Sequence, residues 1–180
     1  MIPMERREGV FAVKRLITTA IAVSALFAPG SAFAKTTRKV ETSPANFTLK
    51  SEACSNLPPG TTINGAGTLT SITWTTKRHG RTTIINSSIA PGTATDQAGN
   101  QYTFLYSNQF HVSNTRSHRK LYSGPMIDVF TLQGAGPAKL SNGFLARYTT
   151  DFKQRQNFSP MDAFGDPIDF STGQAHCDPL

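Results

Sequence analysis

The side chains that could do chemistry in this sequence are basic ones, gathered in three short polar segments. These segments are residues 77–81, 114–123 and 153–157. Clustered guanidinium and ammonium groups attract anionic partners, such as a phosphate-bearing envelope polymer or a lipid headgroup. The candidate binding residues are Lys77, Arg78, Arg81, Arg116, Arg119, Lys120 and Arg155.

One acid and one histidine are candidates for catalysis. Asp128 stands between apolar neighbours on one face of a predicted strand, Met126 and Phe130, so its carboxylate is expected to be partly buried, and burial would either raise its pKa or require a base as partner. His111 lies on the polar face of another predicted strand. Serine-hydrolase, phosphate-loop, zinc-protease and C-x-x-C motifs do not occur in the sequence, so no catalytic residue is assigned.

No cofactor and no metal site is predicted. Oxygen-rich loops can hold calcium, and the C-terminal region contains several aspartates, but their spacing is not that of a calcium-binding loop. These aspartates are Asp162, Asp166, Asp169 and Asp178.

The two cysteines are far apart in the sequence, at Cys54 and Cys177. In an exported protein an even number of cysteines predicts a disulfide. A bond between these two would join the two ends of the domain and, on the chain-entropy model, stabilise it by roughly 3 to 5 kcal/mol.

The first 34 residues have the three parts of a secretory signal peptide. A basic segment ends at Lys14 and Arg15, an apolar stretch covers residues 16–28, and the small residues Ala32 and Ala34 follow. The apolar stretch is too short for a membrane-spanning helix. We expect a Sec-type leader cleaved after Ala34, a secreted or periplasmic mature protein, and no transmembrane segment after cleavage.

Composition favours a β protein of one domain. The chain has 180 residues and a formal net charge of +7. After the leader, its only glutamates are Glu41 and Glu52, whereas β-branched residues are abundant, which disfavours a helical bundle. We expect a signal peptide over 1–34, an N-terminal segment with the disulfide anchor over 35–61, and a single β domain over 62–180.

Alternation of apolar and polar residues predicts the strands. Tyr102, Phe104 and Tyr106 fall on one face of a strand whose other face carries Thr103. In an earlier strand, Ile72 and Trp74 are assigned to the inner face by their apolar character. Strands are expected at 62–76, 82–90, 100–112, 125–133 and 138–152, with weaker ones near 45–50, 157–163 and 167–171.

Short turns between these strands predict an antiparallel meander closed as a small up-and-down barrel, with a two-sheet β-sandwich as the alternative. Alternate turns of a meander emerge at the same end, so the three basic segments are expected to share one end, the basic pole. Sequence-specific nucleic-acid binding is not expected, and the one aromatic residue near the pole, Tyr122, argues against stacking on single strands. The aromatic interior offers the alternative function, a small-ligand carrier or a barrel enzyme.

Three segments, residues 93–104, 136–144 and 166–177, resemble a group of exported bacterial β proteins of uncharacterised function. The resemblance implies bacterial export and a single domain, and it implies no activity or site residue. The function expected from the sequence is therefore the binding of an anionic partner by a non-catalytic exported β protein.

Overall fold

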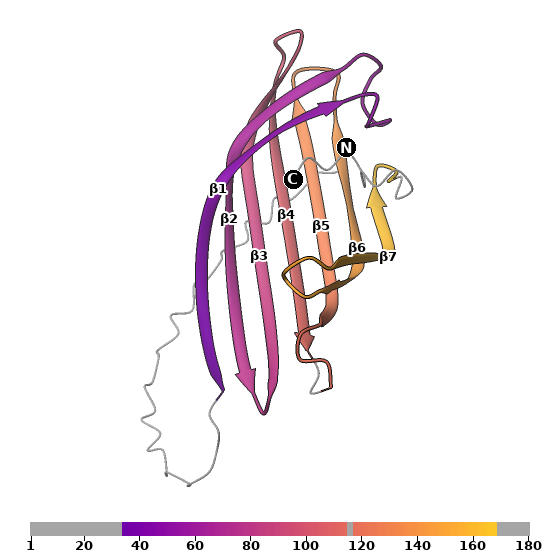
Figure 1. Cartoon of the computed structure of the whole chain (residues 1–180). Helices are drawn as coiled ribbons and strands as arrows, with labels where there is room; N and C mark the ends of the chain where they lie inside the picture. Colours follow the sequence, from indigo (N-terminus) through magenta and orange to yellow (C-terminus); the bar gives the residue numbers. More distant parts are fainter. Residues whose placement is uncertain (1–33, 115–116, 169–180) are drawn as a thin grey trace, which may run out of the picture. The chain divides into compact units, whose positions relative to one another are not determined.

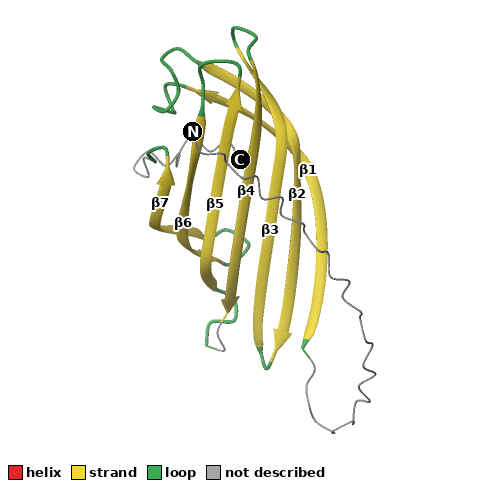
Figure 2. Cartoon of the chain, turned by 180° about the vertical axis from the view of Figure 1, so that it is seen from behind, coloured by secondary structure: helices red, strands yellow, loops and turns green. Residues whose placement is uncertain are grey.

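The computed structural model describes residues 34–114 and 117–168, and these residues form one antiparallel β-sheet. Its strands are β1 (Lys35–Lys50), β2 (Thr62–Arg78), β3 (Arg81–Asp96), β4 (Gln101–Asn114), β5 (Tyr122–Gly134), β6 (Leu140–Thr150) and β7 (Gln156–Gly165). Each strand pairs with the next one in the chain, as Figures 1 and 2 show from opposite sides. The predicted all-β class and the antiparallel meander are confirmed.

The five long strands lie where the alternation predicts them, with shifted ends, and the first strand is much longer than expected. β1 begins at Lys35 and pairs with β2 along its whole length. Residues 35–44 are exposed on both faces, and their charged and hydroxyl side chains are typical of an edge strand. Of the weak strand expected at 167–171, residues 167–168 are not in a strand and the rest lie outside the described residues.

The predicted barrel is wrong, because the sheet is open. β1 and β7 are its two edges and do not pair with each other, and the sandwich is wrong because all seven strands belong to one sheet. Closure requires edges with matched length and register. β1 has 16 residues, whereas β7 has 10, includes Pro160, and shifts its register where it pairs with Leu145 and Ala146. Since proline cannot donate a ladder hydrogen bond, β7 is a poor partner for β1.

A loop contact connects the two sides of the open sheet. Asn56, in the connection between β1 and β2, donates a side-chain hydrogen bond to the carbonyl of Pro167, which follows β7, at 2.8 Å. The same connection places Cys54 in the core, where it is 1% exposed. Cys177 lies outside the described residues, so the disulfide stays a prediction.

The inner face carries two apolar clusters. The first cluster lies around three phenylalanines, where the start of β2, the ends of β1 and β3 and the start of β4 come together. The ring of Phe47 contacts the rings of Phe104 and Phe130 edge-on, with centroid distances of 4.9 and 5.8 Å. The second surrounds Val112 and Tyr148 towards the other end of β4 and β6. The inner face of this sheet is therefore filled largely by aromatic rings packed on one another.

The assignment of Ile72 and Trp74 to the inner face is wrong. Trp74 pairs with Ile85, which is 42% exposed, so both lie on the outer face. The inner positions here are polar, and they satisfy one another, as in the 2.7 Å hydrogen bond between the hydroxyls of Ser71 and Ser88. In the sequence of this part of β2, either of the two alternating sets of residues could face inwards. The register of β2 with β3, and of β3 with the clearly two-faced β4, decides which set does.

Gly67 shows why small residues occur on the inner face of β2. A Cβ atom at this position would lie 2.6 Å from the carbonyl oxygen of Pro91 and 2.8 Å from the ring of Phe104. The pairing of β2 with β3 continues in register on both sides of this glycine, so it does not mark a bulge. Its role is to let an aromatic ring and a neighbouring strand approach closely.

Gly67→Ala is therefore expected to lower the free energy of unfolding by about 1 to 3 kcal/mol, the usual cost of overpacking. Urea denaturation would measure the change. Thr68→Ala is the matched control, because Thr68 is exposed on the outer face, and it should lose less than about 1 kcal/mol. Equal losses in the two variants would contradict the packing role.

Candidate functional site

Two of the three basic segments meet at one end of the sheet. In Figure 1 the tip of the β2–β3 hairpin and the β4–β5 connection lie side by side at the lower end, whereas the β6–β7 turn is drawn above them, where the ring of Phe152 lies 5.2 Å from that of Tyr122 on β5. The adjacent tips carry exposed basic side chains, and from here the name basic pole refers to these: Lys77, Arg78, Arg81, Arg119 and Lys120. Arg116 lies outside the described residues, and Arg155 is exposed in the separate turn.

The β2–β3 tip is a two-residue turn inside the basic segment 77–81. His79 and Gly80 have φ values of 49° and 75°, the left-handed conformations that a type I′ hairpin requires at both central positions. Arg78 and Arg81 flank the turn and pair directly with each other. Directly paired residues share a face of the sheet, so the two guanidinium groups are attached to the same side of the tip.

Asn114 links the two tips of the basic pole. It is 4% exposed; its side-chain oxygen accepts the backbone N–H of Thr82 at 2.6 Å, and its side-chain nitrogen donates to the carbonyl of Arg119 at 2.8 Å. One amide thereby joins the start of β3 to the β4–β5 connection. Sequence reasoning missed this residue, because an asparagine at the end of a strand is also an ordinary start of a turn.

The β6–β7 turn is organised by Asp151. One of its carboxylate oxygens accepts the backbone N–H groups of Lys153, Gln154 and Arg155 at 2.9, 3.0 and 3.0 Å. The N–H of Arg155 is the leading reason that the pKa of Asp151 lies below its ordinary value. The carboxylate is thus committed to its own turn, and the side chains of Lys153 and Arg155 remain exposed.

Asp128 and His111 do not meet. Asp128 is buried on the inner face at 4% exposure, and one of its oxygens accepts hydrogen bonds from the hydroxyl of Tyr106 at 2.9 Å and the amide of Asn108 at 2.7 Å. His111 is exposed and pairs with Ile85 on the outer face. Because the two side chains lie on opposite faces of one sheet, they cannot act as an acid–base pair.

Removing the hydroxyl of Tyr106 tests how Asp128 is accommodated. Tyr106→Phe keeps the ring but withdraws one donor from a buried carboxylate, so the free energy of unfolding should fall by about 1 to 3 kcal/mol. Tyr122→Phe is the control; its hydroxyl makes no hydrogen bond within 34–114 and 117–168, and its loss should cost under about 0.5 kcal/mol. Chemical denaturation of both variants measures the two losses in the free energy of unfolding. Denaturation midpoints that are the same for the two variants would contradict the role given to Tyr106.

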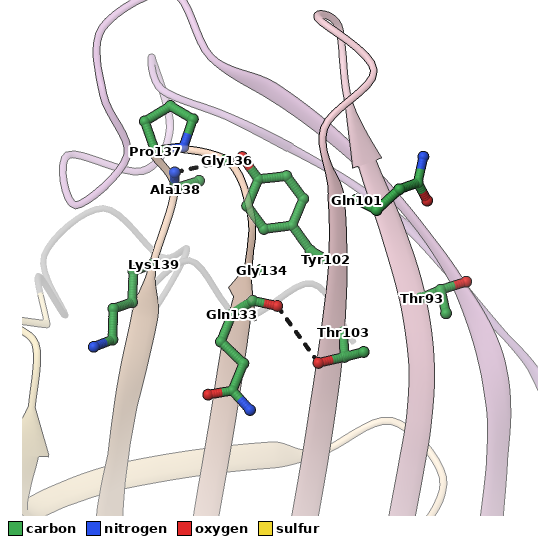
Figure 3. Close-up of a pocket in the computed structure, with 10 residues that line it drawn as sticks. All are labelled: Thr93, Gln101, Tyr102, Thr103, Gln133, Gly134, Gly136, Pro137, Ala138 and Lys139. Atoms are coloured by element: carbon green, nitrogen blue, oxygen red, sulfur yellow. Dashed lines mark hydrogen bonds between the residues drawn. The ribbon is translucent and has the colours of Figure 1, made fainter.

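A pocket of about 720 Å³ lies at the end of the sheet opposite the basic pole and was not predicted. Figure 3 shows it between the outer faces of β3, β4 and β5 and the β5–β6 turn. Its polar lining includes Thr93, Thr103, Gln133 and Lys139. The pocket combines residues from three strands and a turn, so no local sequence signal could have identified it.

Asp96 holds the β3–β4 turn beside this pocket. Its carboxylate accepts the backbone N–H groups of Ala98 and Asn100, each at 2.9 Å, as well as the side-chain amide of Asn100 at 2.8 Å and the hydroxyl of Tyr102 at 3.0 Å. The side-chain hydrogen bond from Asn100 is the main reason that the pKa of Asp96 lies below its ordinary value. Burial raises the pKa of Tyr102, whose hydroxyl also accepts the N–H of Ala138, the contact drawn in Figure 3.

The lowered pKa of Asp96 gives its contribution to stability a definite pH dependence. A carboxyl with a lower pKa in the folded state stabilises the fold above the pKa of the unfolded chain and loses this effect as the pH falls through the folded-state value. Asp96→Ala should therefore unfold at a lower temperature than the unsubstituted protein at neutral pH, and the gap should narrow below about pH 4. Thermal melts across pH measure the gap; one that stays constant into strong acid would contradict the assignment.

A second hollow, of about 430 Å³, crosses the outer face of β2 to β6. We call it the outer groove and define it by its outward side chains: Trp74, Ile85, Ser87, Gln109, His111, Pro125, Ile127 and Leu145. The side-chain amide of Gln109 donates to the hydroxyl of Ser87 at 3.4 Å. The groove depends on the register that brings Trp74 to the outer face, and the sequence assignment of Trp74 to the inner face concealed it.

Within the described part of the chain, no cluster of three or more His, Cys, Asp or Glu side chains is arranged to hold a metal ion. Asp166 accepts the backbone N–H of Ser141 at 2.7 Å, Asp162 is on β7, and Asp169 and Asp178 lie outside the described residues. The same described ranges contain no helix with the length and apolar character needed to cross a membrane.

Comparisons with protein-family models, curated proteins and solved structures find no match to this chain. The resemblance to exported bacterial β proteins therefore stays a prediction. So does the signal peptide, because residues 1–33 lie outside the described ranges.

Proposed function

We propose that this protein is a non-catalytic exported β protein that binds an anionic partner, a phosphate-bearing polymer or a lipid headgroup, through the basic pole. One observation carries the proposal: two neighbouring turns, linked by Asn114, present a group of exposed basic side chains at one end of a single sheet. A surface built in this way offers positive charge at fixed positions, which suits an extended anionic partner.

No carboxylate of the described residues neutralises the charge of the pole. Among residues 34–114 and 117–168, no carboxylate lies within 4 Å of a basic side chain of the pole, whereas Lys39 and Glu41 on β1 form an ion pair at 2.7 Å. Uncompensated charges act over about 8 Å at physiological ionic strength. The five basic groups therefore act together on an approaching anion.

The pairing of Arg78 with Arg81 also favours an anionic ligand. Like charges placed directly opposite each other in a β-ladder destabilise it. An anion bound between the two guanidinium groups would relieve this repulsion and accept charge-assisted hydrogen bonds from both.

The alternative functions gain no specific support. A carrier or an enzyme would use the aromatic interior, but there Phe47, Phe104 and Phe130 pack on one another. The proposed catalytic pair, Asp128 and His111, is divided between the two faces of the sheet. Binding through the basic pole is thus the function that the geometry favours.

The test replaces Arg78, Arg81, Arg119 and Lys120 together with glutamine and measures binding to phosphocellulose and to anionic vesicles at about 0.15 M salt. Each basic residue near an anionic surface contributes about 1 kcal/mol, so the fourfold variant should bind about a thousandfold more weakly. Loss of binding to phosphocellulose alone identifies a phosphate-bearing polymer as the partner, and loss of binding to the vesicles alone identifies a lipid headgroup.

A charge-matched comparison separates the pole from bulk charge. Arg78→Gln with Arg119→Gln removes the same charge as Lys50→Gln with Lys139→Gln, whose sites lie at the opposite end of the sheet. The first pair should weaken retention strongly and the second only slightly. Equal effects, or unchanged retention of the fourfold variant, would overturn the proposal.

A further inference from the structure

The outer groove combines a stacking surface with hydrogen-bonding groups. The indole of Trp74 is partly exposed, and Ile85 and Ile127 add apolar surface at 42% and 38% exposure. Between the apolar groups lie the amide of Gln109 and the hydroxyl of Ser87. Binding sites for small polar molecules have this character, a largely apolar lining with a few polar groups that orient the ligand.

Two arginines lie beside the groove at its two ends. Arg38 on β1 pairs with Trp74, and Arg147 on β6 pairs with Pro125, so both belong to the outer face. Both side chains are exposed, and the guanidinium of Arg147 donates to the hydroxyl of Ser123 at 3.3 Å. Arginine binds carboxylates in a bidentate manner, which makes these ends suited to acidic groups.

The groove runs across the strands, and this orientation fits a chain-like ligand. Gln109 pairs with Ser87 on one side and Ile127 on the other, so groove residues of successive strands lie in a line perpendicular to the strands. Five strand spacings of about 4.8 Å separate Arg38 on β1 from Arg147 on β6, about 24 Å along the sheet. This is the span of a short oligosaccharide rather than of a single small molecule.

We propose that the outer groove binds an acidic polysaccharide, with a sugar ring stacked on Trp74 and carboxylates of the chain paired with Arg38 and Arg147. The C–H face of a sugar ring is apolar and packs on an aromatic ring, while its hydroxyls accept and donate hydrogen bonds to side chains such as Gln109. The site shares no residue with the basic pole, so it does not depend on the function proposed there.

The surroundings of the groove favour a glycan over a membrane surface. Beyond the groove, towards the basic pole, the outer face carries a row of hydroxyls, with hydrogen bonds between Thr36 and Thr76 at 2.9 Å and between Ser123 and Thr149 at 3.1 Å. Such groups match the hydroxyls of a polysaccharide and would be costly to bury in hydrocarbon. The acid on this face, Asp162, pairs with Leu145 from the β7 edge, outside the groove lining.

The single tryptophan of the chain makes the site directly observable. A hexamer of galacturonic acid should shift and saturate the fluorescence of Trp74, whereas its methyl-ester hexamer, which is neutral, should bind at least tenfold more weakly. Arg38→Gln and Arg147→Gln should each weaken binding of the acid hexamer by about tenfold, and Arg→Lys at either position should restore part of the affinity.

Other outcomes would overturn the inference. Absence of a fluorescence response, equal binding of the acid and ester hexamers, or unchanged affinity in both arginine variants would each exclude the acidic-glycan site. A response of Trp74 to anionic vesicles without one to the hexamer would assign the groove to a lipid surface instead. The fourfold variant of the basic pole should keep the Trp74 response, so failure of one site is distinguishable from failure of the other.

Discussion

The unbroken antiparallel register from β1 to β6 is the constraint on which the rest of this structure depends. The pairing from Lys35 with Lys77 on β1 and β2 to Leu132 with Leu140 on β5 and β6 proceeds without a register shift, and the one irregularity occurs between β6 and β7, at Leu145 and Ala146. Side chains along a strand alternate between the two faces of the sheet. Once the register is set, it therefore determines, for each residue of the six strands, whether the side chain lies on the inner or the outer face.

The same constraint explains why polar side chains lie inside. The well-defined apolar face of β4, with Tyr102 and Phe104, determines the inner face, and register then brings Ser71 and Ser88 to the same side. Their mutual hydrogen bond offsets the cost of removing them from water. The apolar side chains of β2 are correspondingly displaced outwards, and an otherwise hydroxyl-rich outer face acquires the outer groove around Trp74.

The register also places charge. In a meander, alternate turns lie at the same end of the sheet, so the β2–β3 and β4–β5 tips meet at one end, as Figure 1 shows. Hydrogen bonds of Asn114 couple the two tips. The third basic turn, between β6 and β7, is held by Asp151 and packs on the start of β5 through Phe152 and Tyr122.

Several features could be predicted from the sequence by itself: the β class, the long strands, the hairpin tip within residues 77–81, and the shared end of two of the three basic segments. Each depends on local alternation, on a turn's conformational preference or on counting strands. Only the tertiary structure decided that Trp74 faces outwards, that the sheet stays open, and that Asn114 joins two turns. These outcomes depend on the free energy of all strands paired in one register. In that register, burying the aromatic face of β4 outweighs burying the apolar residues of β2. The two edge strands differ too much to form a ladder with each other, so the sheet stays open.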